Sequence, residues 1–226
     1  QDKAGDIDEF WSTTLSELAG TPMVVTKELS AEHSNELRNS YRVEITSWNG
    51  EKMGGLLCEP VAPGKYPVYI DYMGYGAPYY WYDPSGNPES IEFLVSVRDQ
   101  GIFKEGQERW IDRGLNSKED FYYRGAFCDV VRAIDFAASL DKADTAHIFA
   151  RGESQGGAFT FISAALDDRI AAAAPAVPFL GDYKHYSQIV WWPVWEVFEA
   201  ADARNISRED LFDMLSYFDV KNFTDR

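Results

Sequence analysis

The sequence predicts an α/β fold built on a mostly parallel sheet. The main indication is that short apolar stretches alternate with helix-like stretches between residues 91 and 174, because parallel strands need long crossover connections. Nearer the N-terminus, Asn49-Gly50 stands between two strand-like stretches, which is typical of a hairpin. Residues 117–140 carry an apolar stripe at helical spacing. We therefore expect a hairpin followed by parallel strands with crossover helices on both faces of the sheet.

The expected elements follow one another in a single domain, residues 1–226. Helices are expected where apolar residues recur every three or four positions, at 6–18, 117–140 (with Ser117 as N-cap) and 154–166. Strands are expected at 41–48, from the hairpin to 58, and at 68–72, 91–97, 147–150 and 170–174. Residues 181–218 lack a strand pattern and are expected to form helices inserted over the sheet edge, after the fourth or fifth recognised strand.

Composition excludes several classes of function. The chain has 21 Lys and Arg against 37 Asp and Glu, a net charge of −16, so nucleic acids and anionic membrane surfaces are not expected partners. No apolar run is long enough to cross a bilayer. The two cysteines, Cys58 and Cys128, form no metal-binding pattern. Aromatic residues make up 15% of the chain, which makes sugars or flat ligands plausible partners.

The segment Gly152-Glu153-Ser154-Gln155-Gly156 carries the chemistry. It fits the pattern G-x-S-x-G, follows a short apolar strand and opens a helix, which is the context that a nucleophile elbow requires. Flanking glycines allow the tight strand-to-helix turn. The N–H of Gln155, at the helix N-terminus, then points to where an oxyanion would develop. The alternative is that Ser154 merely caps the helix.

The sequence resembles the acetyl xylan esterase / cephalosporin C deacetylase family of α/β-hydrolases (carbohydrate esterase family 7). The resemblance covers nearly the whole chain in order. It rests on the segments 8–11, 98–101, 122–133, 151–158, 164–174, 178–182 and 215–220.

The resemblance implies serine ester hydrolysis that releases acetate from acetylated sugars such as xylan, or from small acetyl esters. It makes Ser154 the nucleophile and places the oxyanion hole at the backbone N–H groups of Gln155 and Tyr75, the latter in Gly74-Tyr75-Gly76 after the 68–72 strand. It implies no metal or organic cofactor. Family members form closed oligomers, so a homo-oligomer is expected.

Two features depart from the family. Glu153 replaces the usual glycine before the nucleophile, and we expect its carboxylate to point away beneath the turn. The acid and base of the family follow a region that matches residues 217–219, so the resemblance implies that the catalytic Asp and His, with the C-terminal strands and helix, lie outside residues 1–226. A complementing C-terminal chain or self-association would supply them. His185 is the only histidine after Ser154, and we interpret it as a cap or interface residue.

Aromatic residues near the motif are candidate substrate contacts. Tyr79, Tyr80 and Trp81 follow the oxyanion loop and either line the acyl pocket, stack on sugar or pack on the core. Trp191 and Trp192 in the presumed insertion form either a cleft wall or an oligomer contact.

Two alternatives to a deacetylase stay open. One is a serine hydrolase that cleaves other esters or peptides. The other is a catalytically impaired homologue that binds saccharide or a partner. The chain begins at Gln1 rather than Met, which favours a processed form and a bacterial periplasmic or secreted location over a cytoplasmic one.

Overall fold

The structure, a computed structural model, describes residues 3–104 and 110–225. The strands are β1 (Val25–Ser30), β2 (Arg38–Thr46), β3 (Lys52–Pro60), β4 (Tyr66–Tyr72), β5 (Ile91–Ser96), β6 (Ala143–Glu153) and β7 (Ile170–Ala176). The α-helices are α1 (Ile7–Gly20), α2 (Tyr122–Ser139), α3 (Gln155–Leu166), α4 (Tyr183–Ile189), α5 (Val194–Ala203) and α6 (Arg208–Leu215). Short 3₁₀ turns are η1 (Ala31–His33), η2 (Trp48–Gly50), η3 (Gly101–Phe103) and η4 (Val220–Phe223). Among the described helices, none combines the length and apolarity needed to span a membrane.

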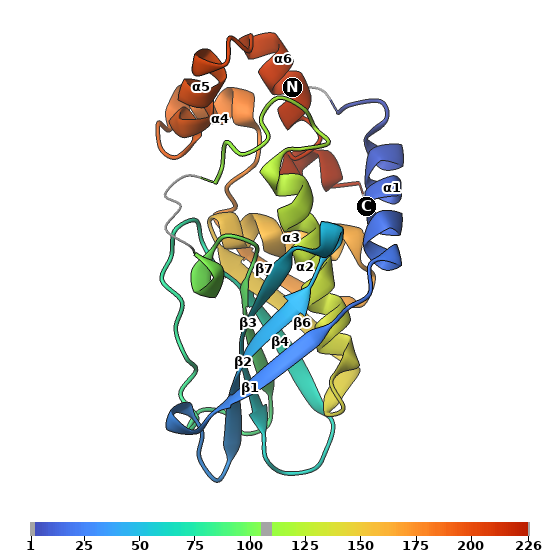
Figure 1. Ribbon diagram of the computed structural model, residues 1–226, viewed down its shortest axis with the longest axis vertical. Helices are drawn as coiled ribbons and strands as arrows, with labels where there is room; N and C mark the ends of the chain where they lie inside the picture. Colours follow the sequence, from blue (N-terminus) through green and yellow to red (C-terminus); the bar gives the residue numbers. More distant parts are fainter. Residues whose placement is uncertain (1–2, 105–109, 226) are drawn as a thin grey trace.

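One seven-stranded sheet runs through the molecule in the order β1-β2-β3-β5-β4-β6-β7 (Figure 1). β1, β2, β3 and β5 pair antiparallel, whereas β5, β4, β6 and β7 pair parallel. Crossover helices on both faces were expected, but α2 and α3 contact each other and both contact β4 and β6. Their two crossovers, β5 to β6 and β6 to β7, run in the same direction across the sheet, and right-handed connections then put both helices on one face.

The hairpin signal identifies the turn between β2 and β3 correctly. Asn49 and Gly50 both have positive φ, 59° and 74°, as a tight hairpin turn requires. The preceding strand β1 was not expected, because residues 25–30 show no clean apolar alternation and stay mostly exposed. β1 is an edge strand that pairs with β2 along its whole length. Its extended form therefore comes from backbone pairing rather than from side-chain burial.

The helix predicted at 117–140 begins five residues later than expected. Ser117 does cap a turn, since its Oγ accepts from the Asp120 N–H at 3.1 Å. The chain then becomes extended at Phe121 (φ −61°, ψ 133°), whose side chain is buried, before α2 begins at Tyr122. Burial of the Phe121 ring thus separates the capped turn from the helix.

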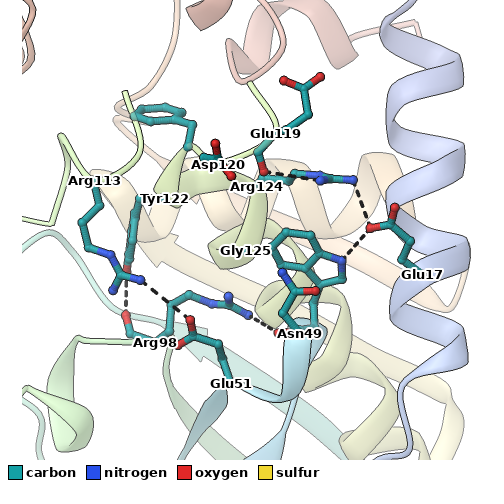
Figure 2. Close-up of a pocket in the computed structure, with 12 residues that line it drawn as sticks. Glu17, Asn49, Glu51, Arg98, Arg113, Glu119, Asp120, Tyr122, Arg124 and Gly125 are labelled. Atoms are coloured by element: carbon teal, nitrogen blue, oxygen red, sulfur yellow. Dashed lines mark hydrogen bonds and ion pairs between the residues drawn. The ribbon is translucent and has the colours of Figure 1, made fainter. Parts of the chain in front are cut away.

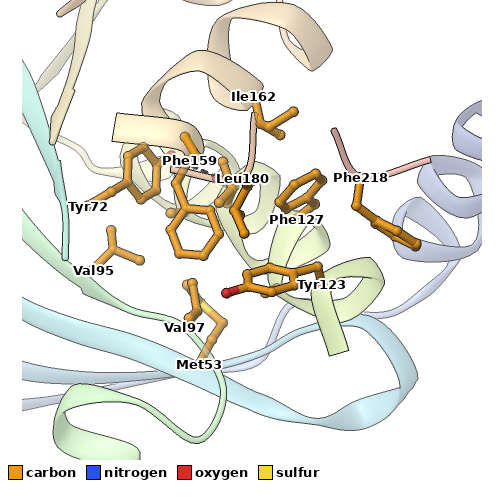
Figure 3. Packing of buried hydrophobic residues seen from close by; sticks show 14 of the residues in the cluster. Met53, Tyr72, Val95, Val97, Tyr123, Phe127, Phe159, Ile162, Leu180 and Phe218 are labelled. Atoms are coloured by element: carbon orange, nitrogen blue, oxygen red, sulfur yellow. Dashed lines mark hydrogen bonds between the residues drawn. The ribbon is translucent and has the colours of Figure 1, made fainter. Parts of the chain in front are cut away.

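Aromatic side chains from four elements meet in the core behind the parallel strands. Phe127 of α2 packs edge-to-face against Phe159 of α3, with ring centroids 6.1 Å apart, and Tyr72 of β4 approaches the same Phe159 ring. Figure 3 shows these rings together with Phe218 from the C-terminal segment. Phe218 also lies against Trp11 of α1 at 5.8 Å. The core therefore ties the N-terminal helix and residues after α6 to the same sheet.

The helices α4, α5 and α6 gather at one end of the molecule, beyond α3 (the top in Figure 1). Helices were expected for this region, but they follow the seventh strand rather than the fourth or fifth. Six strands were expected before these helices, and β1, which the sequence did not predict, is the seventh. Within the described residues β7 pairs only with β6, and six of its seven residues are exposed. β7 is therefore an open edge strand among the described residues.

Candidate active site

Ser154 occupies a strained bend between β6 and α3. Its φ of 58° and ψ of −119° are unusual for a residue with a Cβ. The bend is held by the Ser154 N–H, which donates to the Ala176 carbonyl at 3.1 Å, and by the Phe179 N–H, which donates to the Ser154 carbonyl at 2.9 Å. Ser154 stands at the N-cap position of α3, but its side chain does not cap the helix. The capping role that would explain this serine without catalysis is therefore not present.

The glycines around Ser154 leave no room for side chains. A Cβ on Gly156 would lie 2.0 Å from the Tyr72 carbonyl oxygen, and one on Gly157 would lie 2.4 Å from the Ala176 oxygen. A Cβ on Gly152 would lie 2.5 Å from the Gly156 oxygen. Each of these neighbours is backbone, which cannot swing away as a flexible side chain would. The glycines of the motif are thus required by the close approach of α3 to β4, β6 and β7.

Gln155, which carries one expected oxyanion donor, is completely buried and held by its side chain. Its amide exchanges two hydrogen bonds with the Gln100 amide: Gln155 Nε2 to Gln100 Oε1 is 2.9 Å, and Gln100 Nε2 to Gln155 Oε1 is 3.2 Å. Tyr123 Oη also donates to Gln155 Oε1 at 2.9 Å. Burial raises the pKa of Tyr123 well above its usual range, so the hydroxyl keeps the proton that it donates. The start of α3 is therefore fixed from the interior.

The buried network continues behind Gln100. Gln100 Nε2 donates to Tyr122 Oη at 2.9 Å, and that hydroxyl donates to the Arg98 carbonyl at 2.6 Å. Arg98 in turn makes a bidentate ion pair with Asp129 of α2, with distances of 2.7 and 2.8 Å. Neither Gln100 nor Tyr123 was expected from the sequence to have a role at the site. The available signal was that both lie in segments that resemble the family, 98–101 and 122–133.

A polar cavity of about 420 Å³ lies on the other side of Arg98, between α1, the hairpin turn and the start of α2 (Figure 2). Its guanidinium groups have protein partners: Arg124 Nη2 donates to Glu17 at 3.0 Å, and Arg113 lies 3.8 Å from Glu51. The residues that line it do not include Ser154 or its neighbours. We interpret it as an ion-paired junction that supports the Arg98 network.

Tyr75, the other expected donor, lies in the loop after β4, next to the bend. A Cβ on the preceding Gly74 would lie 3.5 Å from the Glu153 carbonyl oxygen, so the loop and the end of β6 adjoin. The Tyr75 ring lies 4.9 Å from the Trp110 ring, and its hydroxyl donates to Glu196 Oε2 at 2.8 Å. Glu196, on α5, carried no signal in the sequence. Its contact with Tyr75 arises only when the chain has folded.

The three aromatic residues after the oxyanion loop have different surroundings. Tyr79 lines a cavity of about 560 Å³ with Gln100 and Trp110. Tyr80 lines a separate cavity of about 510 Å³ with Glu153. Trp81 instead stacks on the His33 ring at 4.3 Å. Tyr79 and Tyr80 therefore flank the candidate site, whereas Trp81 takes the packing position that was the alternative for it.

The two candidate tryptophans of the inserted segment, Trp191 and Trp192, also have different surroundings. Trp192 lies 6.0 Å from the Tyr75 ring and is 54% exposed. Trp191 stacks on Trp195 at 6.2 Å and is 72% exposed. Only Trp192 of this pair is brought to the oxyanion loop. Trp191 belongs to an exposed apolar surface with Ile189 and Val190.

Each histidine has a hydrogen bond to a residue three positions away. His33 pairs with Ser30, His147 with Asp144, and His185 Nδ1 with Asp182 Oδ2 at 2.7 Å. Within residues 3–104 and 110–225, none of these rings is hydrogen-bonded to Ser154. His185 is an exposed residue in the first turn of α4, where Asp182 is the N-cap residue.

The elbow, the helix N-terminus behind it and two adjacent loops form an arrangement suited to acyl transfer. Ser154 lies at the carboxyl ends of parallel strands, next to the first N–H groups of α3, where negative charge is favoured. Glu153 is exposed and lines the cavity that also contains Arg151 and Asp71. Arg151 Nη2 donates to Asp71 Oδ2 at 3.0 Å, so this charge pair crosses from β6 to β4 beside the bend.

A comparison with known protein families identifies the chain. The family model for acetyl xylan esterase (AXE1) matches residues 1–226. The chain belongs to the acetyl xylan esterase family. The family match and the elbow geometry agree with the α/β-hydrolase core that the sequence predicts.

Individual relatives of this acetyl xylan esterase family member support the same assignment. Acetyl esterase Axe7A of Xylanibacter ruminicola is 26% identical over 251 residues, which cover 98% of this chain but 53% of that protein. The chain thus spans about half the length of this curated relative. Acetyl xylan esterase from Paenibacillus sp. R4 has a TM-score of 0.88 at 25% identity, with 99% of this chain and 77% of that chain covered.

Acetyl xylan esterase 1 from Thermoanaerobacterium sp. JW/SL YS485 has a TM-score of 0.86 at 23% identity, over 99% of this chain and 76% of that chain. This last similarity concerns the fold alone.

Proposed function

We propose that the protein is a serine carboxylic-ester hydrolase that removes acetyl groups from acetylated saccharides such as xylan or xylo-oligosaccharides. The observation that carries this proposal is the strained backbone of Ser154, with φ 58° and ψ −119°, in a glycine-lined bend where the side chain makes no helix-capping hydrogen bond. The family membership and the named relatives, which are acetyl and acetyl xylan esterases, support the substrate class.

In the proposed reaction, the general base takes the Ser154 Oγ proton while Oγ attacks the ester carbonyl. The bond to the saccharide oxygen then breaks, the saccharide leaves as an alcohol with that proton, and Ser154 keeps the acetyl group. Water attacks this acetyl-enzyme with the same base, acetate leaves and the Ser154 hydroxyl is restored. The N–H groups of Gln155 and Tyr75 stabilise the oxyanion, and loss of one such donor typically costs about 2.7–4 kcal/mol of transition-state stabilisation. Tyr79, Tyr80 and Trp192 contact the substrate around the loop. The bound ester needs no metal for this chemistry.

Ser154 needs a general base because an unassisted serine hydroxyl is a weak nucleophile. We propose that the catalytic Asp and His come from outside residues 1–226, from further chain or from a complementing chain that pairs with the open strand β7. The exposure of β7 and the local partners of all three histidines support this part of the proposal.

A fluorophosphonate probe tests the proposal, because it labels only an activated serine. We expect the complete product of the gene to be labelled at Ser154, and the isolated 1–226 polypeptide to be labelled orders of magnitude more slowly. Ser154→Ala should abolish labelling, whereas Ser163→Ala, which changes a buried serine in the middle of α3, should not. Absence of labelling in the complete product, or labelling that persists in Ser154→Ala, would contradict the proposal.

Substrate class is tested with a panel of acetyl, longer acyl and peptide substrates. We expect acetylated xylo-oligosaccharides and small acetyl esters to be cleaved, and longer acyl chains and peptides to be poor substrates. A preference for long acyl chains or peptides would show that the protein is a different serine hydrolase and not a deacetylase. Saccharide binding without hydrolysis would indicate a non-catalytic homologue.

A further inference from the structure

The backbone of the loop that carries Tyr75 is intrinsically flexible. Tyr75 stands between Gly74 and Gly76, and Gly76 has a φ of +69°. One turn is closed by the Ala77 N–H, which donates to the Gly74 carbonyl at 3.1 Å. Glycines on both sides leave the Tyr75 peptide plane free to rotate unless something else fixes it. An oxyanion donor, by contrast, must point in one direction before the reaction begins.

The side chain of Tyr75 supplies the missing restraint. Its hydroxyl donates to Glu196 Oε2 at 2.8 Å. Its ring centroid lies 4.9 Å from that of Trp110 and 6.0 Å from that of Trp192. Glu196 lies in the first turn of α5, and Trp192 directly precedes Pro193, the N-cap residue of that helix. The inserted helices therefore reach Tyr75 through a hydrogen bond and through a ring contact.

Glu196 differs from the other glutamate of α5. It is 8% exposed and lies beside the buried residue Val197, whereas Glu199, one turn later, is exposed. A buried carboxylate is costly unless polar partners surround it. The Tyr75 hydroxyl is one such partner, and hydrogen bonds to a charged acceptor are stronger than neutral ones.

The two expected oxyanion residues are thus held in the same way, by hydrogen bonds of their side chains. Gln155 is anchored by its side chain to Gln100 and Tyr123, and Tyr75 is anchored by its side chain to Glu196. In each case a buried polar partner far away in the sequence fixes the residue whose backbone N–H is used.

We propose that Glu196 is a positioning residue for ester hydrolysis: it holds the Tyr75 side chain so that the Tyr75 N–H points into the oxyanion hole. This inference rests on the proposed function, because it assigns Glu196 a role in that reaction. Glu196 does not touch the reacting atoms. It acts through its hydrogen bond to Tyr75, so this effect belongs to the transition state, in which the oxyanion exists, rather than to substrate binding.

The experiment measures kcat and KM for p-nitrophenyl acetate with the complete gene product. We expect Glu196→Ala to lower kcat about 10- to 100-fold, less than complete loss of an oxyanion donor, with KM changed less than about 2-fold. Glu196→Gln keeps an acceptor oxygen in the same place and should recover kcat to within about 3-fold of wild type. Tyr75→Phe keeps the backbone N–H but removes the bond, and should match Glu196→Ala.

The double variant and a matched control distinguish this role from a structural one. Because both changes break the same bond, Tyr75→Phe/Glu196→Ala should be no worse than either single variant. Glu199→Ala removes an exposed charge from the same helix and should leave kcat and KM unchanged. A rise in KM alone, additive effects or wild-type kcat in Glu196→Ala would overturn the inference, and if that variant does not fold, wild-type kcat in Tyr75→Phe would do so. Failure of the wild-type protein to hydrolyse the ester would instead overturn the proposed function.

Discussion

The two sides of the proposed oxyanion hole are built differently. Gln155 opens a helix that is packed against three strands, and its side chain lies in the sealed interior. Tyr75 lies in a partly exposed loop and is held by an inserted segment beyond β7. The difference teaches that one expected donor is fixed by a helix packed on the sheet, while the other depends on a hydrogen bond to the inserted segment.

The largest expected effect concerns the glycines on the two sides. Gly156→Ala should destabilise the protein by more than about 3 kcal/mol, because its Cβ would lie 2.0 Å from the Tyr72 carbonyl oxygen. Gly76→Ala is the control on the loop side. It has open space around its Cβ but a positive φ, so we expect a cost of about 1–2 kcal/mol. Urea unfolding measures both, and equal losses would show that the core side is no more constrained than the loop.

Two buried tyrosines test the hydrogen bond that holds Gln155. Tyr123→Phe removes the hydroxyl that donates to Gln155 and should cost about 1–2 kcal/mol. Tyr183→Phe is its matched control, since the Tyr183 hydroxyl is buried without a hydrogen-bond partner among the described residues. We expect Tyr183→Phe to be neutral or slightly stabilising in the same unfolding experiment. Destabilisation of similar size in both variants would show that packing, not the bond, fixes Gln155.

The adjacent tryptophans test the loop side. Trp192→Ala removes a ring that lies beside Tyr75, whereas Trp191→Ala removes one that stacks on Trp195. An aromatic contact of this kind is worth about 0.5–1.5 kcal/mol. We therefore expect kcat/KM for acetylated xylo-oligosaccharides to fall roughly 2- to 13-fold in Trp192→Ala and to change little in Trp191→Ala. A larger loss of kcat/KM in Trp191→Ala than in Trp192→Ala would show that the substrate contact lies away from Tyr75.

The smallest effect concerns the anchor of the inserted helices at Asp182. A hydrogen bond from Lys221, assisted by His185, lowers the pKa of Asp182 below its usual value of 3.8. A carboxyl with a lowered pKa stabilises the fold above its unfolded pKa, and this contribution is lost as the pH falls through the folded value. Asp182→Asn should therefore lower the free energy of unfolding at pH 7 by less than about 1 kcal/mol. A slight fall in melting temperature would show this loss. The difference from wild type should shrink as the pH falls below 3.8 and vanish once the folded carboxyl is protonated, and a difference that persists in the protonated state would assign it to another cause.

Local sequence patterns predict the structure correctly where the residue type itself restricts the backbone conformation. Asn49-Gly50 predicts its turn because both residues tolerate positive φ, and the Gly152–Gly156 motif predicts the elbow because only glycine fits beside the neighbouring carbonyls. Helix α1 follows directly from its apolar spacing.

The sequence by itself determined the hairpin turn, the succession of strands along the chain after it and the elbow at Ser154. The tertiary structure decided that β1 is a strand, that α2 begins only after Phe121, that both crossover helices share one face, and that Glu196 meets Tyr75. The physical reason is distance along the chain: propensity, capping and glycine patterns act within a few residues, whereas pairing, burial and a hydrogen bond between residues 121 positions apart exist only once the chain has folded.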